Sequence, residues 1–323
     1  MPLRVVTTYR FEPHEVARIQ SAAPDRGIEI VICGSPEEFR AQLRGAEVIY
    51  GNVTGEDLAL APELKWVQWG AAGVDGMDAK VRASSVTITN MARVFAPAIA
   101  ETAMGLLLSL TRGIVAYYIP RFNRREMTPV GTVKSADHSE LAGRTMGIVG
   151  FGGIGEAVAR RAHFGFDMRI VATDAKPLPK PSYVAELRDP TWFPAMAREV
   201  DVLVSAAPLT PLTRGLFNAP VFQSMKKSAY FLALSRGELF DDAALVDALK
   251  NGSIAGAGLD VFPQEPPPAA HAIFDCPNVV MTAHTSGWST DRQIRLIEFF
   301  AENVRRYAIA QPLANVVDKQ AGY

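Results

Sequence analysis

The chain has 323 residues, which is enough for about two domains that each bury a hydrophobic core. Hydrophobic residues make up 48% of it and the formal net charge is −1, so it has no general attraction for nucleic acids or anionic membranes. Its only cysteines, Cys33 and Cys276, exclude a disulfide framework and a cysteine-based metal site, and we expect no bound metal.

The sequence carries no targeting or membrane signal that we can identify. Its first residues lack the basic start, apolar stretch and small-residue cleavage site of a signal peptide. The most apolar stretch, Ala96–Ile119, is interrupted by Glu101 and Arg112, whereas a membrane span needs about 20 predominantly apolar residues. We therefore expect a soluble, cytoplasmic protein that binds neither membranes nor nucleic acids.

Short apolar runs alternate with helical patterns in the first third of the chain. Two helices are predicted, Pro13–Ala23 and Pro36–Arg44, each opened by a proline where a missing N–H is harmless. The predicted strands are Arg4–Thr8, Ile28–Cys33, Glu47–Tyr50, Lys65–Trp69 and Val86–Thr89. Such alternation predicts a parallel sheet that is covered by helices on both faces.

One long helix is predicted next, over Pro97–Ile119. It is apolar around most of its circumference, so it must be buried between domains or against another subunit. The polar stretch Arg121–Glu140 is expected to form an extended arm. The later predicted strands are Thr145–Val149, Met168–Thr173, Val202–Ser205, Tyr230–Leu234, Ile254–Leu259 and Val279–Thr282. The later predicted helices are Glu156–Ala162, Thr191–Arg198, Asp241–Asn251 and Thr290–Ala310.

A glycine-rich turn, Gly150–Gly155 (GFGGIG), joins the first of these strands to the first of these helices. Gly150 permits a tight turn, Gly152 lets backbone N–H groups approach a pyrophosphate, and Gly155 allows the helix to pack close to the sheet. The positive end of the helix dipole then faces the phosphates. An ordinary glycine-rich turn is the alternative, but the strand, the turn and the helix together favour a dinucleotide site.

Asp174 ends the following strand, at the distance of about 20 residues that is typical of this motif. Its carboxylate can accept hydrogen bonds from ribose hydroxyls and repels a 2′-phosphate. The sequence therefore favours NAD over NADP, although the nearby Lys176 would soften that repulsion.

Three later strands each run into a residue suited to keto-acid chemistry: Arg236, Glu265 and His284. The carboxyl ends of parallel strands share one edge of the sheet, where ligands bind. An arginine can clamp a carboxylate and polarise the adjacent carbonyl, and a histidine can donate a proton as hydride arrives. Two of these residues have a specific ordinary alternative: Arg236 could cap a helix or pair with Asp241, and Glu265 could lie in a solvated loop.

Blocks along nearly the whole chain resemble the D-isomer-specific 2-hydroxyacid dehydrogenase family, in particular its glyoxylate/hydroxypyruvate reductase-like branch. The blocks are Trp66–Asp75 (WVQWGAAGVD), Ala98–Leu107 (AIAETAMGLL), Val204–Phe217 (VSAAPLTPLTRGLF), Phe231–Leu245 (FLALSRGELFDDAAL), Gly258–Pro267 (GLDVFPQEPP) and Asn278–His284 (NVVMTAH). Three positions depart from the family's usual residues: Ala233 replaces asparagine, Ala283 replaces proline and Arg93 replaces glycine.

The resemblance implies an α/β fold of two doubly wound parallel-sheet (Rossmann/flavodoxin-like) domains separated by a cleft. Residues 1–97 plus 291–323 would form the substrate-binding (catalytic) domain and residues 98–290 the NAD-binding domain. It implies hydride transfer between NAD(H) and a small 2-keto or D-2-hydroxy acid, and a homodimer built on segment 97–140. The alternative is an NAD(H)-sensing, corepressor-like binding protein with little turnover, because such relatives can retain the catalytic residues.

The resemblance also implies roles for single residues. Arg236 would bind the substrate, His284 would be the acid/base, and Glu265 would raise the pKa of His284. Backbone N–H groups of Ala72 and Gly73 would hold the substrate carboxylate. The expected cofactor contacts are Gly150, Gly152, Gly153, Ile154, Gly155, Asp174, Ala207, Pro208, Thr213, Leu234, Ser235, Arg236, Asp260, His284 and Gly287. For Asp260, expected near the nicotinamide carboxamide, the alternative is a turn residue at a strand end.

Overall fold

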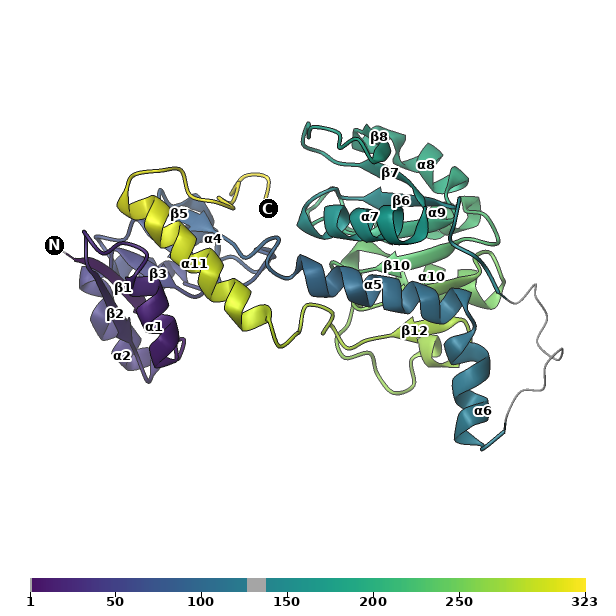
Figure 1. Ribbon diagram of the computed structural model, residues 1–323, viewed down its shortest axis with the longest axis horizontal. Coiled ribbons are helices and arrows are strands. Elements are labelled where there is room, and N and C mark those ends of the chain that lie inside the picture. Colours follow the sequence, from purple (N-terminus) through teal and green to yellow (C-terminus); the bar gives the residue numbers. More distant parts are fainter. Residues whose placement is uncertain (1, 127–137) are drawn as a thin grey trace. The chain divides into compact units, whose positions relative to one another are not determined.

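The computed structural model describes residues 2–126 and 138–323, which form two compact units. One unit comprises residues 1–95 together with 289–323, and the other comprises residues 96–288 (Figure 1). The boundaries expected from the sequence, at 97/98 and 290/291, differ from these limits by two residues. Which unit binds substrate and which binds cofactor stays a prediction.

The described part of the first unit contains a five-stranded parallel sheet with the order β2-β1-β3-β4-β5. The strands are β1 (Leu3–Thr7), β2 (Ile28–Ile32), β3 (Val48–Tyr50), β4 (Trp66–Gln68) and β5 (Thr87–Thr89). They are the strands predicted from the sequence, with each end shifted by no more than one residue. The helices that connect them are α1 (Pro13–Gln20), α2 (Pro36–Gln42), α3 (Gly55–Leu60) and α4 (Ala79–Ala83).

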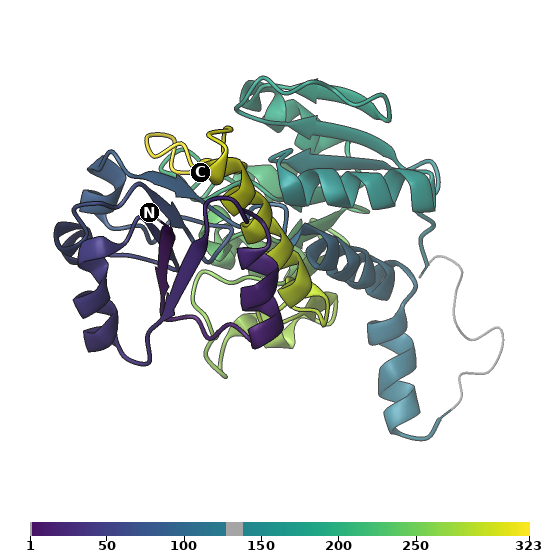
Figure 2. The same ribbon diagram turned by 60° about the vertical axis from the view of Figure 1, so that its left-hand side comes forward.

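The C-terminal helix α11 (Arg292–Ala308) returns to the first unit and lies beside α1 (Figures 1 and 2). Its apolar stripe includes Leu296, Phe300 and Val304, all buried. The Phe300 ring lies 4.7 Å from that of Tyr50 and 5.6 Å from that of Trp66, measured between centroids. The helix therefore covers one face of the sheet through aromatic packing.

The described part of the second unit contains a seven-stranded parallel sheet with the order β12-β11-β10-β9-β6-β7-β8. The strands are β6 (Thr145–Val149), β7 (Arg169–Thr173), β8 (Val184–Arg188), β9 (Val202–Ser205), β10 (Tyr230–Ala233), β11 (Gly256–Leu259) and β12 (Val279–Met281). Chain order reverses direction between the central neighbours β6 and β9, which defines a doubly wound sheet with its switch point there. The α/β fold class predicted from the sequence is confirmed.

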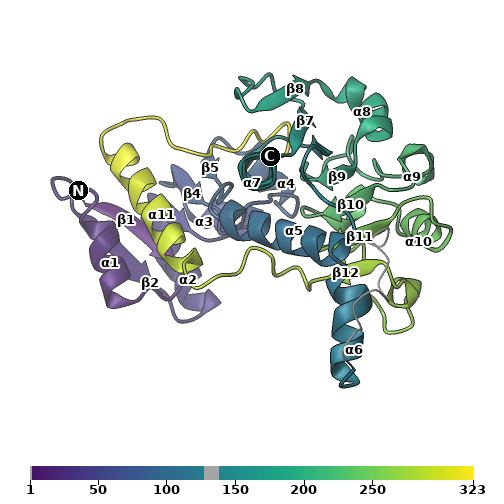
Figure 3. The same cartoon turned by 45° about the vertical axis from the view of Figure 1, so that its right-hand side comes forward.

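Helices pack against both faces of this second sheet. On one face α5 (Ala96–Thr111) lies beside α7 (Gly153–Phe166) and against β11 (Figure 1). The helices on the other side of the strands are α8 (Phe193–Glu199), α9 (Ala219–Ser224) and α10 (Asp242–Lys250) (Figure 3). They share a separate hydrophobic core with the strands. That core is rich in aromatic rings, with Phe231 at its centre between Phe217, Phe222 and Phe240. The sheet is thus a rigid platform whose carboxyl edge can present functional loops.

The prediction of one continuous helix over Pro97–Ile119 is wrong. Helix α5 ends at Thr111, and Gly113 adopts a left-handed conformation with φ of 62°, which interrupts helical hydrogen bonding. A π-helical turn (Ile114–Tyr118) and α6 (Ile119–Asn123) then continue at an angle of 58° to α5. The predicted extended arm, Arg121–Glu140, begins inside α6, and its central part lies outside the described residues.

Helix α6 projects away from the rest of its unit (Figure 2). No single helix among the described residues is long and apolar enough to cross a membrane. Helix α5 and the segment Ile114–Asn123 meet the length and composition criteria only when taken together across their 58° bend.

Candidate active site

The glycine turn after β6 is packed so closely that two of its glycines admit no side chain. Gly150 has φ of 91°, and a Cβ there would lie 2.5 Å from the Cα of Ala207. A Cβ on Gly155 would lie 2.1 Å from the carbonyl oxygen of Gly150. Gly152 is the N-cap of α7 and is exposed, with no atom within 4 Å of an added Cβ. The turn therefore leaves open space at Gly152, where α7 begins and its first N–H groups have no partner within the helix.

Asp174, at the end of β7, is held against this turn. One carboxylate oxygen accepts a hydrogen bond from the N–H of Phe151 (2.7 Å) and the other accepts one from the N–H of Lys176 (2.8 Å). Because each oxygen of an ionised carboxylate can accept a second hydrogen bond, both retain capacity for ribose hydroxyls. The loop after β9 is ordered by Thr213, whose hydroxyl donates to the carbonyl of Pro208 (2.7 Å).

His284 and Glu265 form a hydrogen-bonded pair on the turns that follow β12 and β11. Nδ1 of His284 lies 2.7 Å from Oε2 of Glu265, and Oε1 of Glu265 accepts from the N–H of Phe262 (2.9 Å). An ionised carboxylate only accepts hydrogen bonds, so the proton of this pair resides on Nδ1. The side chains are 43% and 37% exposed, and among the described residues none hydrogen-bonds to Nε2 of His284. The second ring nitrogen thus remains accessible to a substrate.

Asp260 anchors the turn that carries His284. Asp260 is 1% exposed, and its Oδ1 accepts from the hydroxyl of Thr282 (2.7 Å) and from the N–H groups of Thr285 (3.0 Å) and Ser286 (3.1 Å). The hydroxyl of Ser286 donates to Oδ2, and the N–H of His284 donates to the backbone carbonyl of Asp260 (2.8 Å). His284 has φ of 54°, a conformation that costs energy for a residue with a Cβ, so these bonds hold a strained backbone in place.

The sequence alone did not single out Thr282, Thr285 or Ser286. The run of hydroxyl residues around the histidine is a signal that could have pointed to them. Because the carboxylate of Asp260 accepts several hydrogen bonds within this turn, its contacts are those expected of a turn residue at a strand end. Its contact with a nicotinamide carboxamide stays a prediction. Gly287 follows Ser286 in the same turn.

Arg236 lies on the turn after β10, behind the buried residues Leu234 and Ser235. Its guanidinium donates to the carbonyl of Ser235 (2.8 Å), and the side chain is half-buried. A Cβ on the next residue, Gly237, would lie 1.8 Å from the carbonyl carbon of Phe262. The arginine turn therefore packs directly on the backbone that leads to Glu265. Asp241, the alternative partner considered for Arg236, caps α10 by accepting from the N–H of Ala244 (3.0 Å).

Ala72 and Gly73 belong to the other unit, in the loop after β4. The carbonyl of Ala71 accepts from the N–H of Met91 (3.0 Å), and the carbonyl of Ala72 accepts from Nδ2 of Asn90 (2.7 Å). Both alanines and Gly73 are half-buried. Arg93, where the family usually has glycine, is exposed and has φ of 74°, so the chain keeps a glycine-like backbone there without the glycine.

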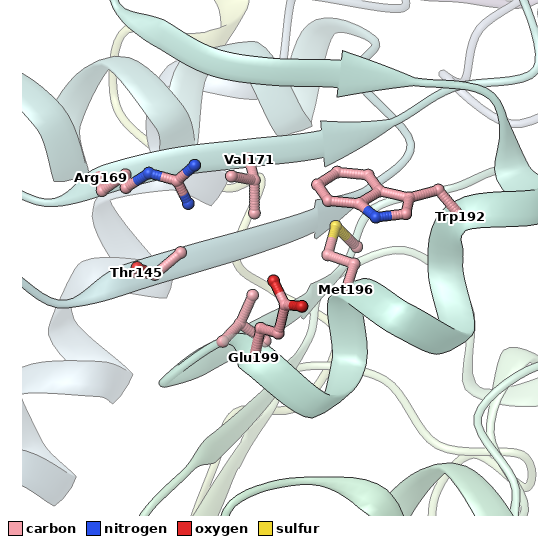
Figure 4. Close-up of a pocket in the computed structure, with 7 residues that line it drawn as sticks. Thr145, Arg169, Val171, Trp192, Met196 and Glu199 are labelled. Atoms are coloured by element: carbon pink, nitrogen blue, oxygen red, sulfur yellow. The ribbon is translucent and has the colours of Figure 1, made fainter.

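Three other features of the described residues were possible alternative sites, but none is a better candidate than the carboxyl edge of the seven-stranded sheet. A cavity of about 90 Å³ lies between β6, β7 and the helix α8 (Figure 4). Thr145 and Arg169 in its wall are the first residues of their strands, so it lies at the amino end of the sheet. Cys33 and Cys276 are buried and unpaired, and burial raises the pKa of both thiols. Among the described residues, no group of three or more acidic, histidine or cysteine side chains could hold a metal ion.

Comparison with known proteins identifies the family. A family model described as D-isomer specific 2-hydroxyacid dehydrogenase, NAD binding domain, matches residues 104–286. The chain is 32% identical over 292 residues to the glycerate dehydrogenase of Methylorubrum extorquens, covering 88% of this chain and 89% of that protein. It is 33% identical over 284 residues to glyoxylate/hydroxypyruvate reductase B of Citrobacter koseri, covering 83% of each.

A solved structure extends the likeness to the fold of nearly the whole chain. It is the NADPH-dependent glyoxylate/hydroxypyruvate reductase of Sinorhizobium meliloti in complex with NADP and sulfate, with a TM-score of 0.79, 27% identity and 99% of both chains covered. These matches confirm the family that the sequence blocks resemble. The chain belongs to the D-isomer-specific 2-hydroxyacid dehydrogenase family, and it is an oxidoreductase that uses a nicotinamide cofactor and acts on 2-hydroxy acids.

Proposed function

We propose that this enzyme reduces small 2-keto acids to D-2-hydroxy acids with NADH, glyoxylate and hydroxypyruvate being the favoured substrates. The observation that carries the proposal is the pairing of His284 with Glu265 at 2.7 Å, with Nε2 of the histidine left accessible. The relatives named above as glycerate dehydrogenase and glyoxylate/hydroxypyruvate reductase support the substrate class.

The residues at the carboxyl edge of the seven-stranded sheet fit a dinucleotide. The open space at Gly152 admits a pyrophosphate to the first N–H groups of α7, and Asp174 retains acceptors for a ribose. We assign the remaining contacts to Ala207, Pro208, Thr213, Leu234, Ser235, Asp260 and Gly287, which lie on loops at the same edge. When bound, the nicotinamide supplies the hydride.

His284 is the proposed general acid for the carbonyl oxygen. Glu265 accepts the Nδ1 proton, so a proton on Nε2 is the one that can be given to the substrate. The N–H of Phe262 fixes the carboxylate, and the carboxylate fixes the ring. Glu265 also faces the positive charge that the ring carries before it donates.

Arg236 and the loop after β4 are the proposed substrate anchors. A guanidinium can bind a carboxylate in a planar, two-bonded arrangement and polarise the neighbouring carbonyl. The N–H groups of Ala72 and Gly73 donate to no partner among the described residues and are suited to hold a carboxylate. Contacts of this kind would orient the keto acid, so that hydride reaches one face of its carbonyl carbon and the product has one configuration.

The test is a steady-state assay at the NADH absorbance band with glyoxylate, hydroxypyruvate, pyruvate, phenylpyruvate and longer keto acids. We expect glyoxylate and hydroxypyruvate to have the highest kcat/KM of these acids. A preference for phenylpyruvate would overturn the proposed substrate class. Tight NADH binding without turnover on any of these acids would instead favour a sensing protein, which the names of the relatives do not support.

We expect NADH to have a higher kcat/KM than NADPH in this assay. The charge of Asp174 repels a 2′-phosphate, and like charges a few ångströms apart cost enough to give a preference of about tenfold or more. The Sinorhizobium relative is NADPH-dependent, so the family does not decide the choice. Asp174→Ala should lower the ratio of kcat/KM for NADH to that for NADPH. A higher kcat/KM with NADPH in the wild type would reject the proposed role of Asp174 in excluding the 2′-phosphate.

We further propose a homodimer built on segment 97–140. Ile114, Tyr118 and Ile119 are 40%, 43% and 45% exposed, and Phe122 is 81% exposed, which is unusual for side chains clustered on one projecting segment. Light scattering should then give a mass near twice the 35.0 kDa of the chain, and a mass of one chain would contradict the dimer. We also propose a cytoplasmic location for the enzyme, as expected in the sequence analysis.

A further inference from the structure

The two N–H groups proposed to hold the substrate carboxylate are oriented by carbonyl groups of their own peptide units. A trans peptide is planar, and its C=O and N–H point in opposite directions. The bond from the N–H of Met91 to the carbonyl of Ala71 (3.0 Å) therefore sets the direction of the N–H of Ala72. The bond from Nδ2 of Asn90 to the carbonyl of Ala72 (2.7 Å) sets that of Gly73 in the same way. Since the donors are consecutive residues, both N–H groups point away from Asn90 and Met91.

Hydrogen bonds fix both the side chain and the backbone of Asn90. It is 6% exposed, and its Oδ1 accepts from the N–H of Ala92 (3.1 Å), which leaves Nδ2 as the group that reaches Ala72. Its backbone N–H donates to the carbonyl of Asn315 (3.1 Å), and Nδ2 of Asn315 donates to the carbonyls of Asn90 (3.4 Å) and Ala92 (2.5 Å). The bonds of Asn315 hold the backbone of this turn, whereas the bond from Ala92 to Oδ1 fixes which way the side-chain amide of Asn90 points. The amide transmits that orientation to the loop after β4.

The loop needs such support because its own sequence supplies little. It contains Gly70 and Gly73, whose backbones are free to adopt many conformations, and Gly70 is tied only through its N–H to Oδ1 of Asn52 (3.2 Å) among the described residues. Hydrogen bonds to a carboxylate are short and directional, so a peptide plane that rotates loses them.

We propose that Asn90 is a positioning residue that directs the N–H groups of Ala72 and Gly73 toward the substrate carboxylate. This inference rests on the proposed function, because it concerns how the same substrate is held. Asn90 would act through the loop and would not touch the substrate.

The test uses Asn90→Ser, with Asn315→Gly as the matched control. A serine hydroxyl can still accept from the N–H of Ala92 but is too short to reach the carbonyl of Ala72. Asn315→Gly removes two bonds to the same turn without touching the loop, and glycine suits the φ of 55° at that position. Steady-state kinetics with glyoxylate and NADH, and Tm, are measured for wild type and both variants.

We expect Asn90→Ser to raise the KM for glyoxylate about tenfold, the value for one lost or misdirected hydrogen bond to a charged group. The kcat and the KM for NADH should stay within about twofold of wild type. Asn315→Gly should lower Tm while leaving the KM for glyoxylate within about twofold. An unchanged KM in Asn90→Ser, or an equal rise in both variants, would overturn the inference, because either result describes a general structural role.

The wild-type measurement separates this inference from the proposed function. A wild type that turns over glyoxylate while Asn90→Ser keeps its KM rejects only the positioning role. A wild type that reduces no keto acid rejects the proposed function, and the positioning role is rejected with it. As a second readout, a neutral keto ester in place of glyoxylate should show little difference between wild type and Asn90→Ser, since it lacks the charge that the N–H groups recognise.

Discussion

Replacing His284 with glutamine is expected to lower the kcat for keto-acid reduction by roughly a hundred- to ten-thousandfold, the usual contribution of a general acid. Glutamine can still form hydrogen bonds but has no proton of suitable acidity to donate. The KM for NADH should change by no more than about threefold, because the glycine turn and Asp174 lie on other strands. Steady-state rates of NADH oxidation at neutral pH measure both quantities.

His271 provides a matched control for this substitution. Its Nε2 lies 2.5 Å from Oδ2 of Asp242, so it is also a histidine paired with a carboxylate, but it follows the proline-rich loop after Glu265 and starts a short 3₁₀ turn. His271→Gln should leave kcat within about twofold. A His284→Gln enzyme that retains most of its kcat would remove His284 from the mechanism.

Gly237→Ala is expected to lower kcat/KM roughly a hundredfold although it touches no substrate, because displacements near 1 Å have effects of this size. The new Cβ would lie 1.8 Å from the carbonyl carbon of Phe262 and 2.1 Å from its oxygen. Backbone must therefore move, and the turns that carry Arg236 and Glu265 are forced apart. Unfolding free energy should fall by about 1–3 kcal/mol, the usual cost of overpacking. Kinetics and chemical denaturation of the purified variant measure these changes.

Gly147→Ala separates the loss of geometry from the loss of stability. Gly147 lies inside β6, and its added Cβ would meet side-chain atoms of Val200 at 2.8 Å and Met196 at 3.3 Å. This variant should also lose about 1 kcal/mol of stability but should keep kcat/KM within about twofold. Equal activity in Gly237→Ala and Gly147→Ala would show that the contact of Gly237 with Phe262 does not position the site.

The strands and the glycine turn were predictable because their signals are local. An apolar run of four to six residues bounded by glycine or charged residues favours a buried parallel strand. Strand β8 (Val184–Arg188) was missed because it includes Glu186 and Arg188, which pair on the exposed edge of the sheet. The helices α3 and α4 have six and five residues, too few to show a helical period.

The break after α5 was not predictable from hydrophobicity. Ile114 and Val115 continue the apolar pattern past Gly113, and the pattern alone does not reveal that this glycine takes a left-handed conformation. Asp260 was singled out from the sequence as a cofactor contact, but its supporting role and that of Asn90 were not predictable, for a different reason. Asp260 and Asn90 act through bonds to residues that are 22 and 18 positions away, Thr282 and Ala72, and such pairings exist only after the strands are in register.

The imidazole–carboxylate pair is assembled by turns after two neighbouring strands of a single unit, β11 and β12. The entropy of ordering these side chains is therefore lost once, when the sheet forms, and is not lost again in each catalytic cycle. When a keto acid binds, its carbonyl oxygen meets an imidazole that is already oriented to donate a proton. We would accordingly expect the crystal structure of the free enzyme to show the same ring orientation as that of a ternary complex.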